Sequence, residues 1–396
     1  MTTIAAPSRA STLALHGGTP VASPSIPIVS VTISEEDIQA AVAVMRSGMM
    51  AQGKNCLALE EKFGRASEAK FALTCANGTC ALQLAYEPLI KPGDEVLVPA
   101  WSYIATVSMV VARGGVPVFV DADPETYNID VHDAAKKVSK RTTAIAATHL
   151  YGNPVNIDGV ESLAAKHGLS IIYDAAQAHL ATYHGKGIGA YGDVTTYSFY
   201  ATKNMTTGEG GMVTTNDEEL FKEMKLLRSH GETQKYIHGR VGYNYRMTDL
   251  EAAIGLSQFN RLPEYTSRRQ KTAAALDRAI GAIPGLHAPK MTPEAEGVYH
   301  LYPVRIDEGR FKTPAEGTVR DEFCKALNAE GIATAIHYPR SLTRQPAFEK
   351  HVKDHPPVAD RLSRTLFCVP VHHNLSESQT KQIGEALHKV AEAMRG

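Results

Sequence analysis

One segment near the middle of the chain constrains its fold more than any other. The apolar run 169–173 is typical of a buried strand and ends abruptly at Asp174. Further along, Lys203 lies between two short runs rich in β-branched and aromatic residues, 195–200 and 212–215. We therefore expect two strands joined by a turn that carries the lysine. Polar side chains would then gather at strand ends, which is where open α/β sheets place their sites.

The combination of Asp174 and Lys203 predicts a particular chemistry. A lysine held among apolar and aromatic side chains loses solvation, so its neutral amine becomes more accessible and can form a Schiff base. A buried aspartate at a strand end can hold the protonated nitrogen of a pyridine ring, which pyridoxal phosphate (PLP) needs as an electron sink. Either residue alone is more often a surface lysine or a helix cap. Together, within one strand-turn-strand pattern, they favour a catalytic site.

Short apolar segments alternate with helical segments over the first part of the chain. The segments predicted to be strands are residues 71–76, 95–99, 116–120, 144–150 and 169–173. Because strands that alternate with helices form parallel sheets with right-handed crossovers, the pattern indicates an α/β fold.

Two of these strands lead into further candidate residues. Asn77, Gly78 and Thr79 break the first strand before a helix, and a glycine turn there leaves backbone N–H groups that can bind phosphate. The same three residues would also cap an ordinary helix. Trp101, the only tryptophan, follows the strand 95–99. A flat aromatic side chain at a strand end can stack on a pyridine ring, although a core or interface tryptophan fits the sequence equally well.

The composition argues against several classes of protein. Lys plus Arg total 41 and Asp plus Glu total 42, which argues against a nucleic-acid surface. No apolar run reaches the ~18 residues of a transmembrane helix, and the first 25 residues lack the apolar core of a signal peptide. The five cysteines have no metal-ligand spacing. We therefore expect a cytoplasmic protein with reduced core thiols, no metal site and no membrane partner.

Three motifs carry a resemblance to a known family: DAAQAH at 174–179, SFYATKN at 198–204 and GEGGMV at 208–213. In this order and spacing they resemble the PLP-dependent aminotransferases of the DegT/DnrJ/EryC1/StrS type, often called sugar aminotransferases. The resemblance extends from about residue 27 to the C-terminus. It implies the fold type I of PLP-dependent transferases, an α/β fold. Its large domain has a mainly parallel seven-stranded sheet and is followed by a smaller C-terminal α+β domain.

The resemblance implies catalytic roles for two residues. Lys203 would hold PLP covalently as a Schiff base and would then move a proton between the substrate carbon and the cofactor. Asp174 would keep the ring nitrogen protonated. His179 lies two residues beyond Gln177, where it could touch the cofactor or substrate; a satisfied core histidine is an equally good interpretation.

Eight residues are expected to bind the cofactor. They are Gly78, Thr79, Trp101, Asp174, Gln177, Ser198, Lys203 and Asn244. By the resemblance, Ser198 and Thr79 would bind the phosphate, Gln177 the phenolic oxygen of the ring, and Trp101 the ring face. Asn244 would reach the phosphate from the second subunit of a homodimer with shared active sites.

The length of 396 residues is enough for two domains. Residues 1–25 are rich in Ala, Ser, Thr and Pro and are expected to form a flexible arm. We expect the large PLP-binding domain over residues 26–262 and the small domain over residues 263–396.

The expected reaction moves an amino group from an amino acid, glutamate or glutamine, to a keto-sugar or a cyclitol ketone in amino-sugar or natural-product biosynthesis. A PLP-dependent dehydratase or aromatising synthase on the same scaffold is one alternative. Dehydratase relatives carry histidine at the position of Lys203, which argues against that branch, whereas aromatising relatives keep the lysine. A non-catalytic PLP-binding regulator is the other alternative, and the retained lysine, acid and phosphate residues make it less favoured.

Overall fold

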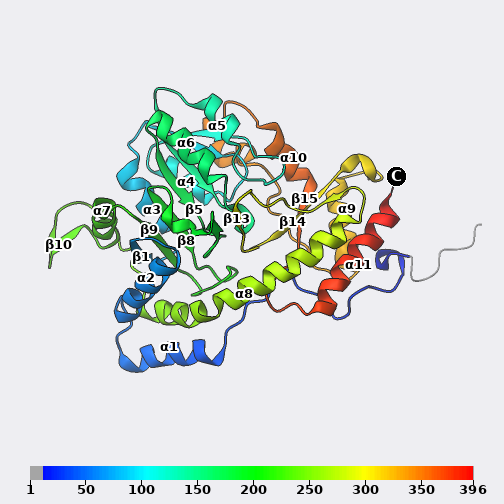
Figure 1. Ribbon diagram of the computed structural model, residues 1–396, viewed down its shortest axis with the longest axis horizontal. Coiled ribbons are helices and arrows are strands. Elements are labelled where there is room, and N and C mark those ends of the chain that lie inside the picture. Colours follow the sequence, from blue (N-terminus) through cyan, green and yellow to red (C-terminus); the bar gives the residue numbers. More distant parts are fainter. Residues whose placement is uncertain (1–11, 396) are drawn as a thin grey trace, which may run out of the picture.

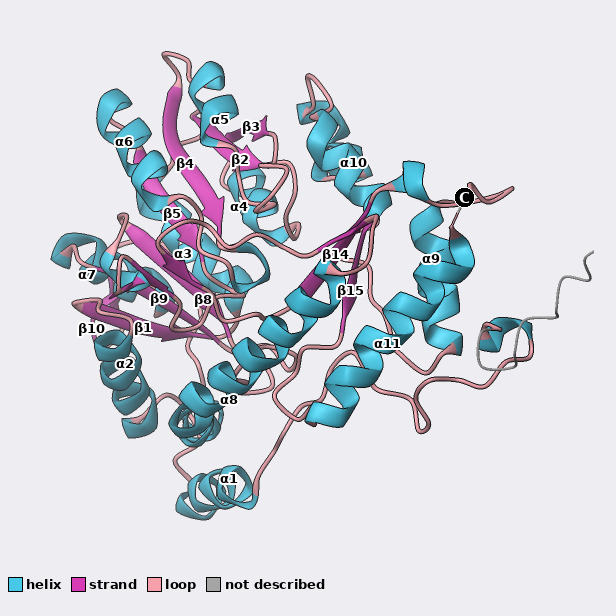
Figure 2. Ribbon diagram, turned by 45° about the vertical axis from the view of Figure 1, so that its right-hand side comes forward, coloured by secondary structure: helices cyan, strands magenta, loops and turns pink. Residues whose placement is uncertain are grey.

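A seven-stranded sheet forms the centre of the protein in the computed structural model, which describes residues 12–395 (Figures 1 and 2). In their order across the sheet, the strands are β1 (Phe71–Cys75), β9 (Gly211–Thr215), β8 (Val194–Ser198), β5 (Ser170–Asp174), β4 (Thr142–Thr148), β2 (Glu95–Pro99) and β3 (Val116–Val120). All of these strands run in one direction except β9, which is antiparallel to both of its neighbours. The predicted α/β fold with a mainly parallel seven-stranded sheet is confirmed.

Helices cover both faces of this sheet. One face carries α3 (Gly78–Leu89), α4 (Ala105–Ala112) and α7 (Glu218–Arg228), and the other carries α2 (Lys54–Ala66), α5 (Val131–Lys137), α6 (Ile157–His167) and the first half of α8 (Asp249–Gly281). Side chains alternate between the two faces, as the pleat of a strand requires. In β2, Val96 and Val98 pack with α3 and α4, whereas Leu97 packs in the opposite core. The strands are therefore buried on both sides, and polar side chains are displaced to their ends.

The 33-residue helix α8 passes from the large sheet to the C-terminal part of the chain (Figure 1). It begins at a capping box, in which the Thr248 hydroxyl accepts from the Glu251 N–H and the Glu251 carboxylate accepts from the Thr248 N–H. Pro263 lies inside the helix. The predicted boundary between residues 262 and 263 thus falls within one continuous helix, and the division into two domains stays a prediction.

The C-terminal part contains a small antiparallel sheet covered by helices. The sheet consists of β12 (Leu286–His287), β14 (Tyr302–Ile306) and β15 (Leu366–Val369), and the helices are α9 (Val319–Ala329), α10 (Pro357–Thr365) and α11 (Glu377–Met394). Five shorter strands are β6 (Thr182–Tyr183), β7 (Lys186–Gly187) and β13 (Ala295–Glu296), which form one sheet, and β10 (Glu232–Gln234) and β11 (Ile237–His238), which form a hairpin. A separate core joins α8, α9 and α11 to the small antiparallel sheet.

The N-terminal segment is packed where the structure describes it. The backbone N–H groups of Ala14 and Val21 donate to the Glu330 carboxylate at 2.8 and 3.2 Å, and Lys389 Nζ donates to it at 2.8 Å. Glu330 itself is fully buried. The flexible arm over residues 1–25 stays a prediction, although composition does not reveal that two positions of this segment donate to a buried carboxylate. Residues 1–11 lie outside the described residues.

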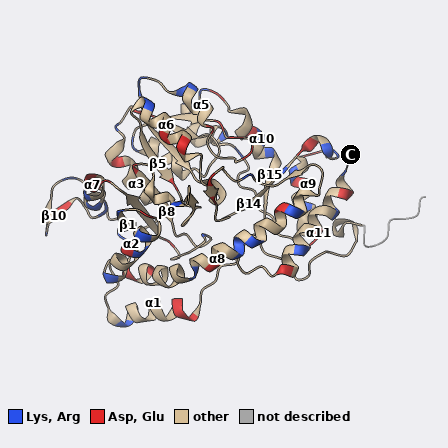
Figure 3. Ribbon diagram, in the orientation of Figure 1, with Lys and Arg blue, Asp and Glu red and all other residues tan. Residues whose placement is uncertain are grey.

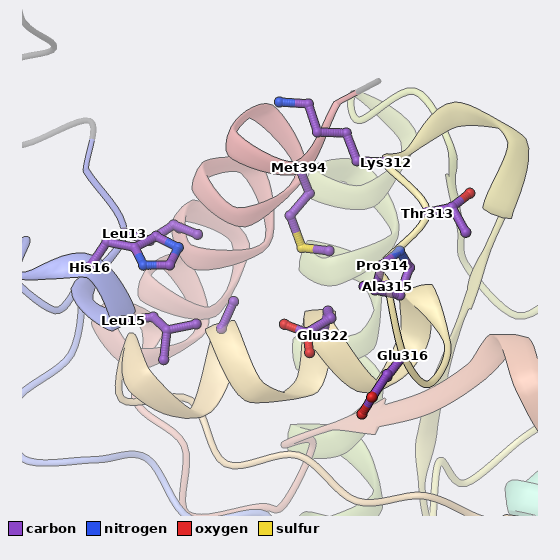
Figure 4. Close-up of a pocket in the computed structure, with 11 residues that line it drawn as sticks. Leu13, Leu15, His16, Lys312, Thr313, Pro314, Ala315, Glu316, Glu322 and Met394 are labelled. Atoms are coloured by element: carbon purple, nitrogen blue, oxygen red, sulfur yellow. The ribbon is translucent and has the colours of Figure 1, made fainter.

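The same segment forms one wall of a pocket of about 520 Å³ between α9 and the end of α11 (Figure 4). Leu13, Leu15, Glu322 and Met394 are among the lining residues, and the residues predicted to bind a cofactor are not. Over residues 12–395, no helix is both long and apolar enough to cross a membrane, and no cluster of His, Cys, Asp and Glu could hold a metal ion. Acidic and basic residues are interspersed along the helices (Figure 3).

Replacing Glu330 with glutamine should lower the free energy of unfolding by about 3 kcal/mol, because it leaves the Lys389 ammonium group without its buried counter-charge. Urea unfolding measures the change. Glu392→Gln is the matched control, since Glu392 pairs with Arg395 at 2.8 Å on the surface, and its effect should stay below about 1 kcal/mol. Equal effects of the two changes would contradict the role of Glu330 in holding the N-terminal segment.

Candidate active site

The carboxyl ends of the parallel strands bring the predicted residues to one edge of the sheet. Asp174 is the last residue of β5 and Ser198 the last residue of β8. Gly78 begins α3, three residues after the end of β1, and Trp101 follows the end of β2 by two residues. Because parallel strands end at the same edge, residues more than a hundred positions apart meet there, as the general rule for open α/β sheets requires.

Asp174 is a buried carboxylate held by two neutral donors. Its Oδ2 accepts from Thr106 Oγ1 at 2.6 Å, and its Oδ1 accepts from the Ala176 N–H at 3.0 Å. Only 5% of the residue is exposed. Burial raises the pKa of Asp174, while these hydrogen bonds and the charge of Lys203 act in the opposite direction. A buried carboxylate bonded by neutral donors has room for a cationic partner, and a protonated pyridine nitrogen fits this requirement.

Lys203 lies in the turn between β8 and β9. Its backbone N–H donates to the Tyr200 carbonyl oxygen at 2.9 Å. The side chain of the next residue, Asn204, donates from Nδ2 to the Val298 carbonyl oxygen at 2.9 Å. Burial lowers the pKa of Lys203 to about 8, although the charge of Asp174 opposes that change. A substantial fraction of the amine is therefore neutral near physiological pH and able to attack a carbonyl carbon.

The N-terminus of α3 forms a site suited to phosphate. Asn77 caps the helix by accepting from the Cys80 N–H at 2.9 Å, and the first N–H groups of a helix, here those of Gly78 and Thr79, have no partner within the helix. A Cβ atom on Gly78 would lie 2.7 Å from the Cβ of Ser198, so glycine allows the helix to start against the end of β8. The two N–H groups and the Ser198 hydroxyl thus lie together at the positive end of a helix dipole.

Gln177 and Trp101 are joined through a tyrosine that the sequence did not single out. Gln177 Oε1 accepts from the Tyr151 N–H at 2.6 Å and its Nε2 donates to Tyr338 Oη at 3.2 Å, while Trp101 Nε1 donates to Tyr151 Oη at 3.0 Å. Trp101 is only 1% exposed, and the ring of Tyr338 approaches it edge-on at 5.8 Å. Stacking of Trp101 on a cofactor therefore stays a prediction. Tyr151 carried no local signal, since nothing in its neighbouring residues distinguishes it from a core tyrosine.

Two candidates lie outside this group of contacts. His179 is fully buried, and its Nε2 lies 2.6 Å from the Ser198 carbonyl oxygen. Burial lowers the pKa of His179 to about 3, so it is a neutral core histidine that supports the end of β8. Asn244 is exposed, and its backbone pairs with Ser229. No hydrogen bond among residues 12–395 connects its side chain with the others.

Reductive labelling of the apoprotein with a small aldehyde should modify Lys203 with a pH midpoint of about 8, because only the neutral amine attacks. Peptide mass spectrometry follows Lys203, and the other lysine peptides serve as internal comparisons. Asp174→Asn should move the midpoint to lower pH, since the carboxylate charge stabilises the ammonium form. An identical midpoint in both proteins would contradict the coupling between the two groups.

Several known proteins are similar to this chain over most of its length. A pleiotropic regulatory protein of Geobacillus stearothermophilus is 36% identical over 89% of this chain and 92% of that protein. The crystal structure of S. venezuelae DesV in complex with a ketimine intermediate has a TM-score of 0.87 at 34% identity and covers 93% of this chain and 99% of that one. The PLP-form of a putative sugar aminotransferase, Spr1654 from Streptococcus pneumoniae, has a TM-score of 0.86 at 28% identity, with 93% and 99% covered. Since residues 31–388 also match the family model itself, the chain belongs to the DegT/DnrJ/EryC1/StrS aminotransferase family.

Proposed function

We propose that this protein is a PLP-dependent sugar aminotransferase that moves the amino group of glutamate or glutamine to a keto-sugar or a cyclitol ketone. One observation carries the proposal: the buried carboxylate of Asp174 and the Lys203 amine, whose pKa is lowered by burial, share the strand-end edge of an aminotransferase fold. Bound at this edge, PLP supplies an electron sink that stabilises negative charge on the substrate carbon.

Lys203 has two tasks in this proposal. It would hold the cofactor covalently, and its free amine would accept a proton from the substrate carbon and later return one. A pKa of about 8 suits both directions of transfer near neutral pH. Asp174 stabilises the protonated ring nitrogen, and because it is buried, this charge pair is strong.

The remaining predicted residues orient the cofactor. The N–H groups of Gly78 and Thr79 and the hydroxyl of Ser198 bind the phosphate. Gln177 uses its Oε1 for the Tyr151 N–H and one N–H for Tyr338, so its second Nε2 proton is left for the phenolic oxygen of the ring.

Asp174→Asn removes the charge that holds the ring proton, and losing one member of a buried charge pair costs several kcal/mol. The rate of donor conversion, followed through the absorbance of the bound cofactor with glutamate as donor, should fall at least about a hundredfold. Lys203→Ala should show no turnover, and borohydride should fix the cofactor on Lys203 in the wild-type protein. Near-normal kinetics in Asp174→Asn, or label on another lysine, would refute these assignments.

The alternative hypothesis is a non-catalytic regulator that binds PLP. The name of the Geobacillus relative, a pleiotropic regulatory protein, supports it. The same assay separates the two functions. An aminotransferase converts the bound cofactor and releases one keto acid for each donor consumed, whereas a pure regulator binds cofactor without releasing keto acid. An aromatising synthase would act on its sugar-derived or cyclitol substrate and release water.

The proposal includes a homodimer with shared sites. Helix α1 (Glu35–Ser47) packs on α8 at the outside of the molecule (Figure 1). Helix α1, the segment after it and the start of α2 expose Ile38, Met45, Met49, Met50 and Leu57. Met49 alone is 74% exposed. Exposed apolar side chains in neighbouring elements are typical of a protein interface, and a second copy would cover them. Asn244 of one subunit would then donate to the phosphate held by the other.

Mixing Lys203→Ala with Asn244→Asp tests the shared site, provided that each variant alone is inactive. In a mixed dimer, one of the two sites receives both wild-type residues, so part of the activity should return on subunit exchange. Native mass spectrometry of the mixture confirms that mixed dimers form. If they form, each variant is folded, and no activity returns, the shared site is refuted and Asn244 is a structural turn residue.

A further inference from the structure

A chain of buried hydroxyl groups leads to Asp174 across three neighbouring strand ends. Thr106 Oγ1, on α4, donates to Asp174 Oδ2 at 2.6 Å. Thr148, the last residue of β4, lies with its Oγ1 3.4 Å from Thr106 Oγ1 and 2.9 Å from the Oγ of Ser102, which follows β2. Ser102 Oγ is also 3.4 Å from Thr106 Oγ1. The chain therefore follows the order β5, β4, β2 in the sheet.

The direction of the hydrogen bonds follows from the carboxylate. An ionised carboxylate only accepts, so the single hydroxyl proton of Thr106 must point to Asp174. The oxygen of Thr106 is then free to accept from Thr148 or Ser102, which polarises its own O–H bond further. The backbone of Thr106 is fixed as well, because Tyr86 Oη donates to its carbonyl oxygen at 2.8 Å.

This chain lies in the interior of the protein. Ser102, Thr106, Thr148 and Asp174 are each at most 5% exposed. A hydrogen bond to a charged group is therefore strong here, and its loss is not compensated by water. Burial is the largest cause of the raised pKa of Asp174, and the Thr106 hydroxyl is the largest cause that lowers it again.

We propose that Thr106 is a positioning residue for the reaction: its hydroxyl, supported by Thr148 and Ser102, keeps the Asp174 carboxylate ionised and oriented toward the cofactor nitrogen. The inference rests on the proposed function, because it assigns to Asp174 the pyridine nitrogen as its partner. Thr106 itself acts only through Asp174. Its contribution is to offset the cost of burying this charge before any cofactor binds.

The test uses the pH dependence of stability in the apoprotein, so it does not depend on turnover. A carboxyl group whose folded pKa lies above its unfolded value contributes stability at low pH, and that stability is lost as the pH rises through the folded pKa. Thr106→Val keeps the shape and removes the donor, which raises the pKa of Asp174 further. The variant should therefore lose more stability than wild type as the pH rises from about 4.5 to about 7.5.

The measured quantity is the unfolding equilibrium constant of Thr106→Val divided by that of wild type. We expect this ratio to be at least about tenfold larger at pH ~7.5 than at pH ~4.5. The other titratable groups that face Asp174 are Lys203, Tyr86 and Tyr338. Lys203 has a pKa of about 8, above this range, and burial raises the pKa of both tyrosines. In an Asp174→Asn background, Thr106→Val should have an effect that does not change with pH.

Thr195→Val is the matched control. Thr195 is 1% exposed, and its Oγ1 has no hydrogen-bond partner within residues 12–395, so the change removes a buried hydroxyl that holds no charge. Its effect should be small and the same at every pH. Thr106→Ser, which keeps the hydroxyl, should restore the wild-type pH dependence. If Thr106→Val does not fold, Thr106→Ser against Thr106→Ala makes the same comparison.

A second measurement connects the apoprotein result with the reaction. In the cofactor-loaded protein, Thr106→Val should slow donor conversion by about tenfold, with recovery in Thr106→Ser. A pH-independent effect of Thr106→Val, equal in form to that of Thr195→Val, would overturn the inference even if the protein proves to be an aminotransferase. An unchanged conversion rate would also overturn it. A pH-dependent effect in a protein without turnover would refute the proposed function and leave the hydroxyl chain in place.

Discussion

The burial of one carboxylate at the end of a parallel strand is the constraint on which the site depends. An unpaired charge in the interior is unstable, so some neighbours of Asp174 must donate hydrogen bonds to it or carry positive charge. The structure meets this requirement with the Thr106 hydroxyl, the Ala176 N–H and, at longer range, Lys203. These three groups belong to different elements. The fold must therefore bring α4, the turn after β5 and the turn after β8 together to stabilise the buried charge.

The sheet explains why much of the site could be predicted. Asp174, Ser198 and Gly78 follow or end strands whose apolar pattern is visible in the sequence, and parallel strands end at one edge. For Lys203 the signal in the sequence was a lysine between two runs of strand-forming residues. In the structure this position is desolvated, which lowers the pKa of the lysine. The family motifs then gave these positions roles that spacing alone could not.

The parts that could not be predicted depend on contacts between distant segments. Tyr151 joins Gln177 and Trp101 through its N–H and its hydroxyl, yet its own sequence environment is that of a core residue. The N-terminal segment was predicted to be flexible because it is rich in small and polar residues. In the structure, backbone N–H groups of this segment donate to Glu330, more than 300 residues away. In both cases the partner lies on another element, so no local pattern records the interaction. Asn244 is similar, since its expected partner belongs to a second subunit.

Asp174 and Lys203 respond to burial in opposite directions, and this relation connects the fold with the chemistry. Burial favours the neutral form of each, raising the pKa of the acid and lowering that of the amine. In the apoprotein each charge is therefore the other's main ionic compensation. A cofactor cation beside Asp174 would take over the role of the Lys203 ammonium group and leave the lysine free to remain neutral. Cofactor binding would thus stabilise the folded protein by mass action and also set the lysine in the form that accepts a proton.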